Sequence, residues 1–181
     1  MSKKNLEILK KGGVGVIATD TLLGVVGLAF NKKVVERIYK IKSRTKTKPF
    51  IILISSLKDL GRFGIRPNQK TRKILKKYWP GRFSLILPCP GYKFKYLHRG
   101  RKNLAFRLPA KKSLIKILKE IGPLVAPSAN PEGKKPARNI REARKYFGKK
   151  VDFYQIGKQR KRAKASTLIK LEEGRELILR K

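Results

Sequence analysis

The chain has 181 residues, which is enough for one domain with a substantial hydrophobic core. Its 48 Lys and Arg residues stand against 11 Asp and Glu residues, which gives a formal net charge of +37. The 40% hydrophobic content excludes a disordered polyelectrolyte, and the charge indicates attraction to anions, RNA above all. Because Lys and Arg are spread over the whole chain, compositional drift toward lysine explains the excess equally well.

The single cysteine, Cys89, and the single histidine, His98, exclude two classes of protein. A structural zinc site needs about four Cys or His ligands, and a disulfide framework needs paired cysteines. The sequence therefore predicts a cytoplasmic protein without a metal site of its own. His98 lies in the basic stretch YLHRGRKN, where we expect a surface histidine rather than a catalytic one.

The apolar stretch from Gly13 to Phe30 has the look of a signal peptide or a membrane span. Asp20 lies near its middle, where an acidic residue costs about 2.5–3.5 kcal/mol in a membrane helix. The stretch also carries several glycines. Two short strands around a polar turn at 19–21 fit better, so we expect no membrane segment.

Hydrophobic periodicity predicts helices and strands that alternate along the chain. In chain order they are a helix at 5–11, strands at 14–18 and 25–30, a helix at 32–42, a strand at 50–55, a helix at 67–79, strands at 83–88 and 103–109, a helix at 111–121, a strand at 123–127, a helix at 139–147, and strands at 151–156, 166–171 and 176–180. This interleaving predicts an α/β fold, a single domain over residues 1–181 with one mixed sheet covered by helices. Residues 157–165 are predicted to be a mobile basic loop.

Small hydroxyls, amides and cations lie at the ends of several predicted strands, where loops on a rigid scaffold carry chemistry. They occur in four places: Thr19-Asp20-Thr21, the pair Lys42 and Arg44, Arg107 within LAFRLP, and the pair Ser128 and Asn130. In an extended segment, Lys42 and Arg44 would point to one side. Each place also has a purely structural interpretation, as a turn, a solvated helix end, an outward strand residue or a cap.

Together the four places describe one kind of pocket, with several cations and small donors but almost no acid or histidine. Such a pocket is poorly suited to acid–base chemistry at neutral pH. It is well suited to binding an anionic substrate and to stabilising charge on a transferring phosphorus atom. The arginines favour a bidentate grip on a carboxylate or phosphate. The sequence has no GxxxxGK[ST] phosphate loop.

Six motifs occur in a characteristic order from about Leu6 to Arg180. They are ATDTLLGVVGLAFN, IYKIKSRTKTKPF, WPGRFSLIL, LAFRLPA, LVAPSANPEGKKPA, and STLIKL followed by ILR. Their order resembles the YrdC family of bacterial threonylcarbamoyl-AMP synthases. The resemblance implies a twisted mixed sheet flanked by helices (α+β, YrdC-like) with a concave basic groove. It also implies the short form of the family, which lacks the extra C-terminal domain.

The resemblance implies a nucleotidyltransferase that converts L-threonine, bicarbonate or CO2, and ATP to threonylcarbamoyl-AMP and diphosphate, with Mg2+ accompanying ATP. A downstream tRNA threonylcarbamoyl transferase complex would then modify the anticodon-adjacent adenosine (t6A) of tRNAs that read codons beginning with A. In the implied mechanism, the carbamate formed from threonine and CO2 attacks the α-phosphorus of ATP in line. No protein nucleophile is required, which suits a pocket without a usable histidine or cysteine.

Residue by residue, the resemblance implies one catalytic set and two overlapping binding sets. The implied catalytic tetrad is Lys42, Arg44, Ser128 and Asn130. Threonine binding is implied for Thr19, Thr21, Arg107, Ser128 and Ser166. Nucleotide binding is implied for Lys42, Arg44, Ala126, Asn130 and Arg180.

The first motif departs from the family pattern at two positions. Ala18 stands where the family usually has proline, and Leu23 stands where it usually has tyrosine. The glycines at 24 and 27 are kept, in the form Gly-Val-Val-Gly. Loss of the tyrosine ring and hydroxyl leads us to expect looser packing around the threonine.

Two other classes of function remain open from the sequence. A non-enzymatic RNA-binding protein of the same fold would use the groove for an RNA backbone, which the charge favours. Only 8% of residues are aromatic, and no RNP-type platform is present in the sequence. A ribosome-associated basic protein would carry disordered basic tails, whereas both ends of this chain show apolar periodicity. An RNA binder needs cations but does not need Ser128 and Asn130 in register.

Overall fold

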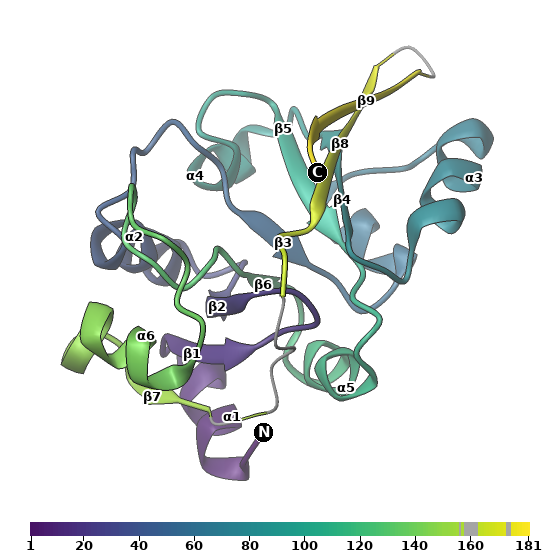
Figure 1. Cartoon of the computed structure of the whole chain (residues 1–181). Helices are drawn as coiled ribbons and strands as arrows, with labels where there is room; N and C mark the ends of the chain where they lie inside the picture. The colour runs from purple at the N-terminus through teal and green to yellow at the C-terminus, as the bar shows by residue number, and fades with distance from the viewer. Residues whose placement is uncertain (156, 158–162, 173–174) are drawn as a thin grey trace.

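The computed structural model describes residues 1–155, 157, 163–172 and 175–181 (Figure 1). Within these residues, nine strands form one sheet in the order β7-β1-β2-β6-β3-β5-β4-β8-β9. The strands are β1 Gly15–Ala18, β2 Leu23–Leu28, β3 Ile51–Leu53, β4 Phe83–Pro88, β5 Asn103–Arg107, β6 Leu124–Val125, β7 Phe153–Tyr154, β8 Thr167–Glu172 and β9 Arg175–Arg180. Three neighbouring pairs are parallel, β1 with β7, β3 with β5 and β4 with β8, and the others are antiparallel. The predicted mixed α/β sheet is therefore confirmed.

Helices lie on both faces of the sheet. They are α1 Lys3–Lys10, α2 Lys32–Ile41, η1 Leu57–Phe63, α3 Gln69–Tyr78, η2 Tyr92–Phe94, α4 Lys95–His98, α5 Lys112–Ile121, α6 Ile140–Phe147 and η3 Gly148–Lys150. Each of the five helices predicted from periodicity is present, and no end differs from the prediction by more than two residues. The four elements that the sequence did not predict, η1, η2, α4 and η3, have seven, three, four and three residues, and such short elements leave little periodic signal.

The two faces of the sheet are covered to different extents. Because side chains alternate along a strand, neighbours point to opposite faces. One face is packed throughout, with Val25 and Phe106 in a core that also includes residues of α2, α3, α6 and η1. On the other face, α1 and α5 cover the region around Val26 and Leu53. No helix among the described residues covers the rest of that face, over β3, β5, β4 and β8, which is available for a site.

The C-terminal hairpin of β8 and β9 borders this uncovered region (Figure 1). The β9 strand is exposed at every residue, and its apolar residues Leu177, Ile178 and Leu179 are 49%, 51% and 49% exposed. Leu177 and Leu179 alternate to the same side and reach the cavity described below. The β9 strand therefore forms one wall of the site, whereas β8 also contributes Ile169 to the core.

The structure corrects one prediction about a titratable residue. His98 is 3% exposed and ends the short helix α4, whereas we expected it on the surface. Its Nδ1 accepts hydrogen bonds from the backbone N–H groups of Gly100 and Lys102, at 3.2 and 3.4 Å. The local sequence is basic enough to look solvated, but the imidazole is needed to close the turn after α4. His98 is therefore a structural residue.

Two other predictions can be compared only with the part of the chain that the structure describes. Most of the predicted loop at 157–165 lies outside the described residues, because 158–162 are not among them. None of the helices in the described part of the chain combines the length and apolar character needed to cross a membrane.

Candidate functional site

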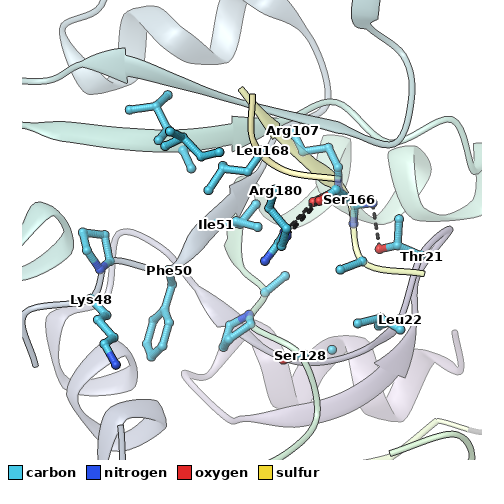
Figure 2. Close-up of a pocket in the computed structure, with 18 of the residues that line it drawn as sticks. Thr21, Leu22, Lys48, Phe50, Ile51, Arg107, Ser128, Ser166, Leu168 and Arg180 are labelled. Carbon is cyan, nitrogen blue, oxygen red and sulfur yellow. Dashed lines mark hydrogen bonds between the residues drawn. The ribbon is translucent and has the colours of Figure 1, made fainter. Parts of the chain in front are cut away.

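A cavity of about 650 Å³ lies on the uncovered part of the sheet (Figure 2). Its apolar floor includes side chains that alternate onto one face of four strands: Ile51, Ala105, Ile86 and Leu168. Six cationic side chains also line it: Arg44, Lys48, Arg101, Arg107, Lys170 and Arg180. None of the described lining residues is acidic. The cavity has the size and chemistry for an anionic ligand that also carries an apolar part.

Eight of the ten site residues predicted from the sequence line this cavity. They are Thr19, Thr21, Arg44, Arg107, Ala126, Ser128, Ser166 and Arg180. Figure 2 shows Thr21 and Arg107 on one side of the cavity, Lys48 and Phe50 on the other, and Arg180 between them. The remaining two, Lys42 and Asn130, are not among the described lining residues. Their side chains instead hydrogen-bond to backbone carbonyls of the loop around Ser128.

Lys42 is a buried cation. It caps the C-terminus of α2, its side chain is 1% exposed overall, and its Nζ donates to the carbonyl oxygens of Ser128 and Asn130. Burial, helped by the nearby charge of Arg44, lowers the pKa of Lys42 from 10.5 to about 7, and Glu132 opposes this shift. The ammonium therefore ties the loop around Ser128 to the end of α2.

The extended arrangement that we expected for Lys42 and Arg44 is wrong. Ser43 has a φ of 47°, and the backbone N–H of Arg44 donates to the carbonyl of Tyr39 at 3.1 Å. The chain therefore turns sharply as it leaves the helix. Lys42 points into the protein, and Arg44 lines the cavity.

The Pro-Ser-Ala-Asn segment is held against the first residues of β2. The backbone N–H of Val25 donates to the carbonyl of Pro127 at 2.9 Å, and that of Ala129 donates to the carbonyl of Leu23 at 2.8 Å. These bonds continue the pairing of β2 beyond β6. Ser128 is thus held by hydrogen-bonded backbone at the wall of the cavity.

The spacing of Ser128 and Asn130 has a structural explanation. Their carbonyl groups, two residues apart, both accept from Lys42. The Ser128 hydroxyl donates to Asn130 Oδ1 at 2.6 Å, and the Asn130 amide donates to the carbonyls of Pro131 and Lys134 at 2.9 and 2.7 Å. Asn130 therefore holds the following turn in place and orients the Ser128 hydroxyl.

Arg107 and the Thr19-Asp20-Thr21 turn form one unit. Arg107 is 3% exposed, its Nη1 donates to Thr21 Oγ1 at 2.9 Å, and the same atom lies 3.0 Å from Asp20 Oδ1. Its buried Nε has no hydrogen-bond partner within the described part of the chain. Thr19 Oγ1 lies 3.1 Å from Thr21 Oγ1 and donates to the carbonyl of Leu22 at 2.7 Å. Burial lowers the pKa of Arg107, and Asp20 opposes this shift. The guanidinium is thus pre-oriented at the cavity wall and has donor capacity for a carboxylate.

Ser166 and Arg180 are joined at the opposite end of the sheet from β1. Arg180 donates through Nη2 to the Ser166 carbonyl at 2.8 Å and to its hydroxyl at 3.3 Å. The Ser166 hydroxyl also bonds the hydroxyl of Ser84 at 2.8 Å, and both serines are buried. Burial, with Arg44 nearby, lowers the pKa of Arg180. Ser84, which the sequence did not single out, is thus the buried support of this pair.

Glu132 links the two loops that bear the predicted tetrad. Its carboxylate accepts from the Thr45 backbone N–H at 2.6 Å, the Thr45 hydroxyl at 2.8 Å and Lys48 Nζ at 2.6 Å. Its own backbone N–H donates to the carbonyl of Lys42 at 2.8 Å. Lys48 and then Thr45 lower the pKa of Glu132 from 4.5 to about 2. The sequence analysis missed this contact, because an acid in a turn carries no signal of a partner 84 residues away.

Three lining cations were also missed: Lys48, Arg101 and Lys170. One of them, Lys170, had a usable signal. In β8, Lys170 alternates with Leu168, and in β5, Asn103 alternates with Arg107, so one face of these strands could have been followed to the cavity. Arg101 precedes β5 and donates to the carbonyl of Thr47 at 2.7 Å, which only tertiary structure reveals.

The fold and the cavity define an α/β protein with a mixed sheet, one face of which carries a cavity lined by six cations. The chain belongs to the Sua5/YciO/YrdC family, because the family model, described as "Telomere recombination", matches residues 7–181. The resemblance stated from the motifs is therefore confirmed.

Individual relatives agree with this assignment. A protein from Methanocaldococcus jannaschii is 33% identical over 184 residues, which cover 98% of this chain and 86% of that protein. A relative from Hahella chejuensis, named threonylcarbamoyl-AMP synthase, is 28% identical and is covered over 85% of its length. A relative of the same name from Pyrococcus abyssi is 27% identical over 95% of this chain, which spans only 51% of that longer protein.

Solved structures show the same fold. P. abyssi Sua5 complexed with L-threonine has a TM-score of 0.88 at 27% identity, over 98% of this chain and 52% of that one. E. coli YciO has a TM-score of 0.85 at 23% identity, over 98% of this chain and 87% of that one. The likeness to YciO concerns the fold alone.

Proposed function

We propose that this protein is an L-threonylcarbamoyladenylate synthase. It converts L-threonine, bicarbonate or CO2, and ATP to threonylcarbamoyl-AMP and diphosphate, which makes it a nucleotidyltransferase. The observation that carries the proposal is the cavity itself, with six cations, small hydroxyls and no acidic residue among its described lining residues. The proposal is supported by the names of relatives in the same family.

The threonine end of the cavity is assigned to Arg107 and the Thr19–Thr21 turn. The solved Sua5 structure with L-threonine supports an amino acid ligand for this fold. In our proposal the threonine carboxylate binds the Arg107 guanidinium, and the hydroxyls of Thr19, Thr21 and Ser166 face the rest of the amino acid. Because Arg107 is rigidly held by Thr21 and Asp20, it loses little freedom when the ligand binds.

The nucleotide end is assigned to the cations on the Lys48 side of the cavity and to Arg180 in its middle (Figure 2). Arg44, Lys48 and Arg180 are placed to neutralise phosphate oxygens, and Ala126 offers backbone to the nucleoside. Ser128 lies between the two ends, at the wall. Lys42 contributes by holding this loop through two carbonyls. Charge that develops on the α-phosphorus would be stabilised by fixed cations, without a protein nucleophile.

Mg2+ belongs to the substrate in this proposal. The described residues contain no group of three or more His, Cys, Asp or Glu side chains able to hold a metal ion. Mg2+ in such sites keeps several waters and is bound largely by substrate phosphates. The ion would enter as MgATP, and the protein's cations would act beside it.

The product would leave for a downstream tRNA threonylcarbamoyl transferase complex in the cytoplasm, for t6A modification of tRNAs that read codons beginning with A. Threonylcarbamoyl-AMP is a mixed anhydride, and such an acyl phosphate is consumed by acyl transfer to a nucleophile. This part of the proposal rests on the family resemblance, and the chemistry of the product adds only that an acyl acceptor must consume it.

The experiment that tests the proposal is diphosphate release by the purified protein with MgATP, omitting threonine or bicarbonate in turn. We expect release that requires both, and a large loss of it in Arg44→Met and Arg107→Met. Lys40→Met serves as the matched control, because Lys40 is an exposed cation on α2. Release that is indifferent to threonine would contradict the proposal.

A non-enzymatic RNA-binding protein remains the second candidate, favoured by the net charge of +37. RNA affinity alone would not decide between them, because so basic a protein binds any polyanion in a salt-sensitive way. A folded protein that binds RNA but neither binds MgATP nor releases diphosphate would favour this second candidate.

A further inference from the structure

Four side chains form a continuous series of contacts from the surface of α2 to the cavity, which we call the four-residue stack: Arg99, Tyr39, Phe50 and Arg44. The Arg99 guanidinium carbon lies 4.0 Å from the centre of the Tyr39 ring. The rings of Tyr39 and Phe50 are stacked, with centres 4.0 Å apart and planes at 23°. The Arg44 guanidinium carbon lies 5.4 Å from the centre of the Phe50 ring. Phe50 and Arg44 line the cavity, whereas Tyr39 and Arg99 do not touch it.

A backbone carbonyl closes the stack at the cavity. The Tyr39 hydroxyl donates to the carbonyl oxygen of Lys48 at 3.0 Å. Arg44 Nε donates to the same oxygen at 3.2 Å. The Lys48 carbonyl therefore has one side fixed by a buried tyrosine and the other occupied by the guanidinium. Arg44 has two anchors, this carbonyl and the Phe50 ring, and Tyr39 contacts both.

The end of the stack farther from the cavity is the Arg99 guanidinium, a largely buried positive charge. Arg99 pairs with Glu36 through Nη1 at 2.7 Å, and its side chain is only 12% exposed. Its Nε and Nη2 are buried and make no hydrogen bond in the described part of the chain. A buried guanidinium with unpaired N–H groups is costly, and the Tyr39 ring face compensates for part of that cost. The stack is thus built into the fold rather than formed by chance surface contacts.

We propose that Tyr39 is a positioning residue for nucleotide binding, which aims the Arg44 guanidinium at the phosphates of MgATP through the Lys48 carbonyl and the Phe50 ring. This inference rests on the proposed function, because it assigns Arg44 to the nucleotide. Tyr39 itself is buried and does not touch the ligand. A flexible arginine on a turn would lose side-chain entropy on binding, and a pre-fixed one loses less.

The test is the dissociation constant of MgATP for Tyr39→Phe, measured by titration calorimetry on the full chain. The substitution keeps the ring stack and deletes only the hydroxyl. We expect binding weakened by about two- to tenfold, the range for loss of one neutral hydrogen bond. KM for ATP should rise by a similar factor, while KM for threonine stays unchanged.

Tyr96→Phe is the matched control. The Tyr96 hydroxyl also donates to a backbone carbonyl, that of Ala29, at 2.9 Å, and Tyr96 is not among the residues that line the cavity. Both variants lose one tyrosine–carbonyl bond, so both should lose a similar amount of thermal stability. Only Tyr39→Phe should weaken MgATP binding.

A double-mutant cycle distinguishes the positioning of Arg44 from a general loss of protein stability. In an Arg44→Met background, Tyr39→Phe should weaken MgATP binding no further, because the group that it positions is gone. If Tyr39→Phe does not fold, Arg99→Met tests the stack from outside the cavity, with an expected weakening of about twofold.

Three results would overturn the inference: unchanged MgATP affinity in Tyr39→Phe, equal weakening in Tyr96→Phe, or full additivity with Arg44→Met. A wild-type protein that does not bind MgATP would overturn it as well. Failure of the proposed function has a different signature, namely a wild-type protein that binds MgATP but releases no diphosphate with threonine and bicarbonate.

Discussion

Lys42→Met should change the pH dependence of folding more clearly than it changes stability at a single pH. Lys42 is 1% exposed, and burial lowers its pKa from 10.5 to about 7. Between these values the unfolded chain keeps a proton that the folded protein has lost. The unfolded state then binds more protons, so the free energy of unfolding rises with pH through this window. Below about pH 7 both states are charged, and the contribution of Lys42 no longer varies.

The size of the effect follows from the shift. One pKa unit corresponds to 1.36 kcal/mol, so raising the pH from about 6 to about 9 should add roughly 2–3 kcal/mol in the wild type relative to Lys42→Met. The substitution also removes the Nζ donor from the carbonyls of Ser128 and Asn130. The Ser128 carbonyl keeps the Asn130 backbone N–H as a donor, so the cost of about 1–3 kcal/mol arises mainly at the Asn130 carbonyl. That cost does not depend on pH, so the slope of the free energy of unfolding against pH reports the titration of Lys42 alone.

Urea unfolding at about pH 6, 7.5 and 9 measures this slope. Lys40→Met is the control, because it removes an exposed lysine from the same helix. We expect Lys40→Met to keep the wild-type pH dependence and Lys42→Met to lose the rise. Parallel curves for all three proteins would refute the reasoning, since they would mean that Lys42 does not release its proton on folding near neutral pH.

Three further outcomes are expected. Glu132→Gln should remove an acid-sensitive contribution to the free energy of unfolding. The folded-state pKa of Glu132 is lowered to about 2, so the stabilisation is present above about pH 4.5 and is lost as the pH falls toward 2. Between these values, the free energy of unfolding of the variant should therefore depend less steeply on pH than that of the wild type. Ser84→Ala should reduce the free energy of unfolding by about 1 kcal/mol in urea, because the Ser166 hydroxyl loses its buried partner. It should also weaken MgATP binding, because Ser166 accepts hydrogen bonds from Arg180, which is assigned to the phosphates; unchanged MgATP binding would argue against a role for the Ser84–Ser166 pair. Arg107→Lys should raise KM for threonine by tenfold or more with little change in KM for ATP, since a lysine cannot form the bidentate contact with a carboxylate. Equal effects on both KM values would contradict the assignment of Arg107 to threonine.

Much of the site was accessible from the sequence, because motif order and strand alternation are local signals. The Thr-Asp-Thr turn, Arg107 in β5, and Ser128 all lie at the ends of predicted strands and line the cavity. The roles of these residues stay predictions until substrates are tested. The mixed sheet was also predictable, because helices and strands interleave along the chain.

The tertiary structure decided what each polar group contacts. Lys42 and Arg44 are two residues apart and look equivalent, yet one is buried against carbonyls and the other lines the cavity. The left-handed backbone conformation of Ser43 turns the two side chains in different directions, and no residue pattern predicted this conformation. His98 looked solvated among its basic neighbours but is buried, since the turn after α4 needs its imidazole.

The sequence by itself determined the main helices and strands, the family and the set of charged groups, because periodicity and motifs depend only on residues that are near one another in the chain. Only the tertiary structure decided which cations converge, since strands β3, β5, β4 and β8 meet through pairings between distant parts of the chain. It also revealed that α1 and α5 cover only part of one face. The physical reason is that hydrophobic burial specifies which residues go inside, whereas the position of an uncovered surface depends on how all elements pack together.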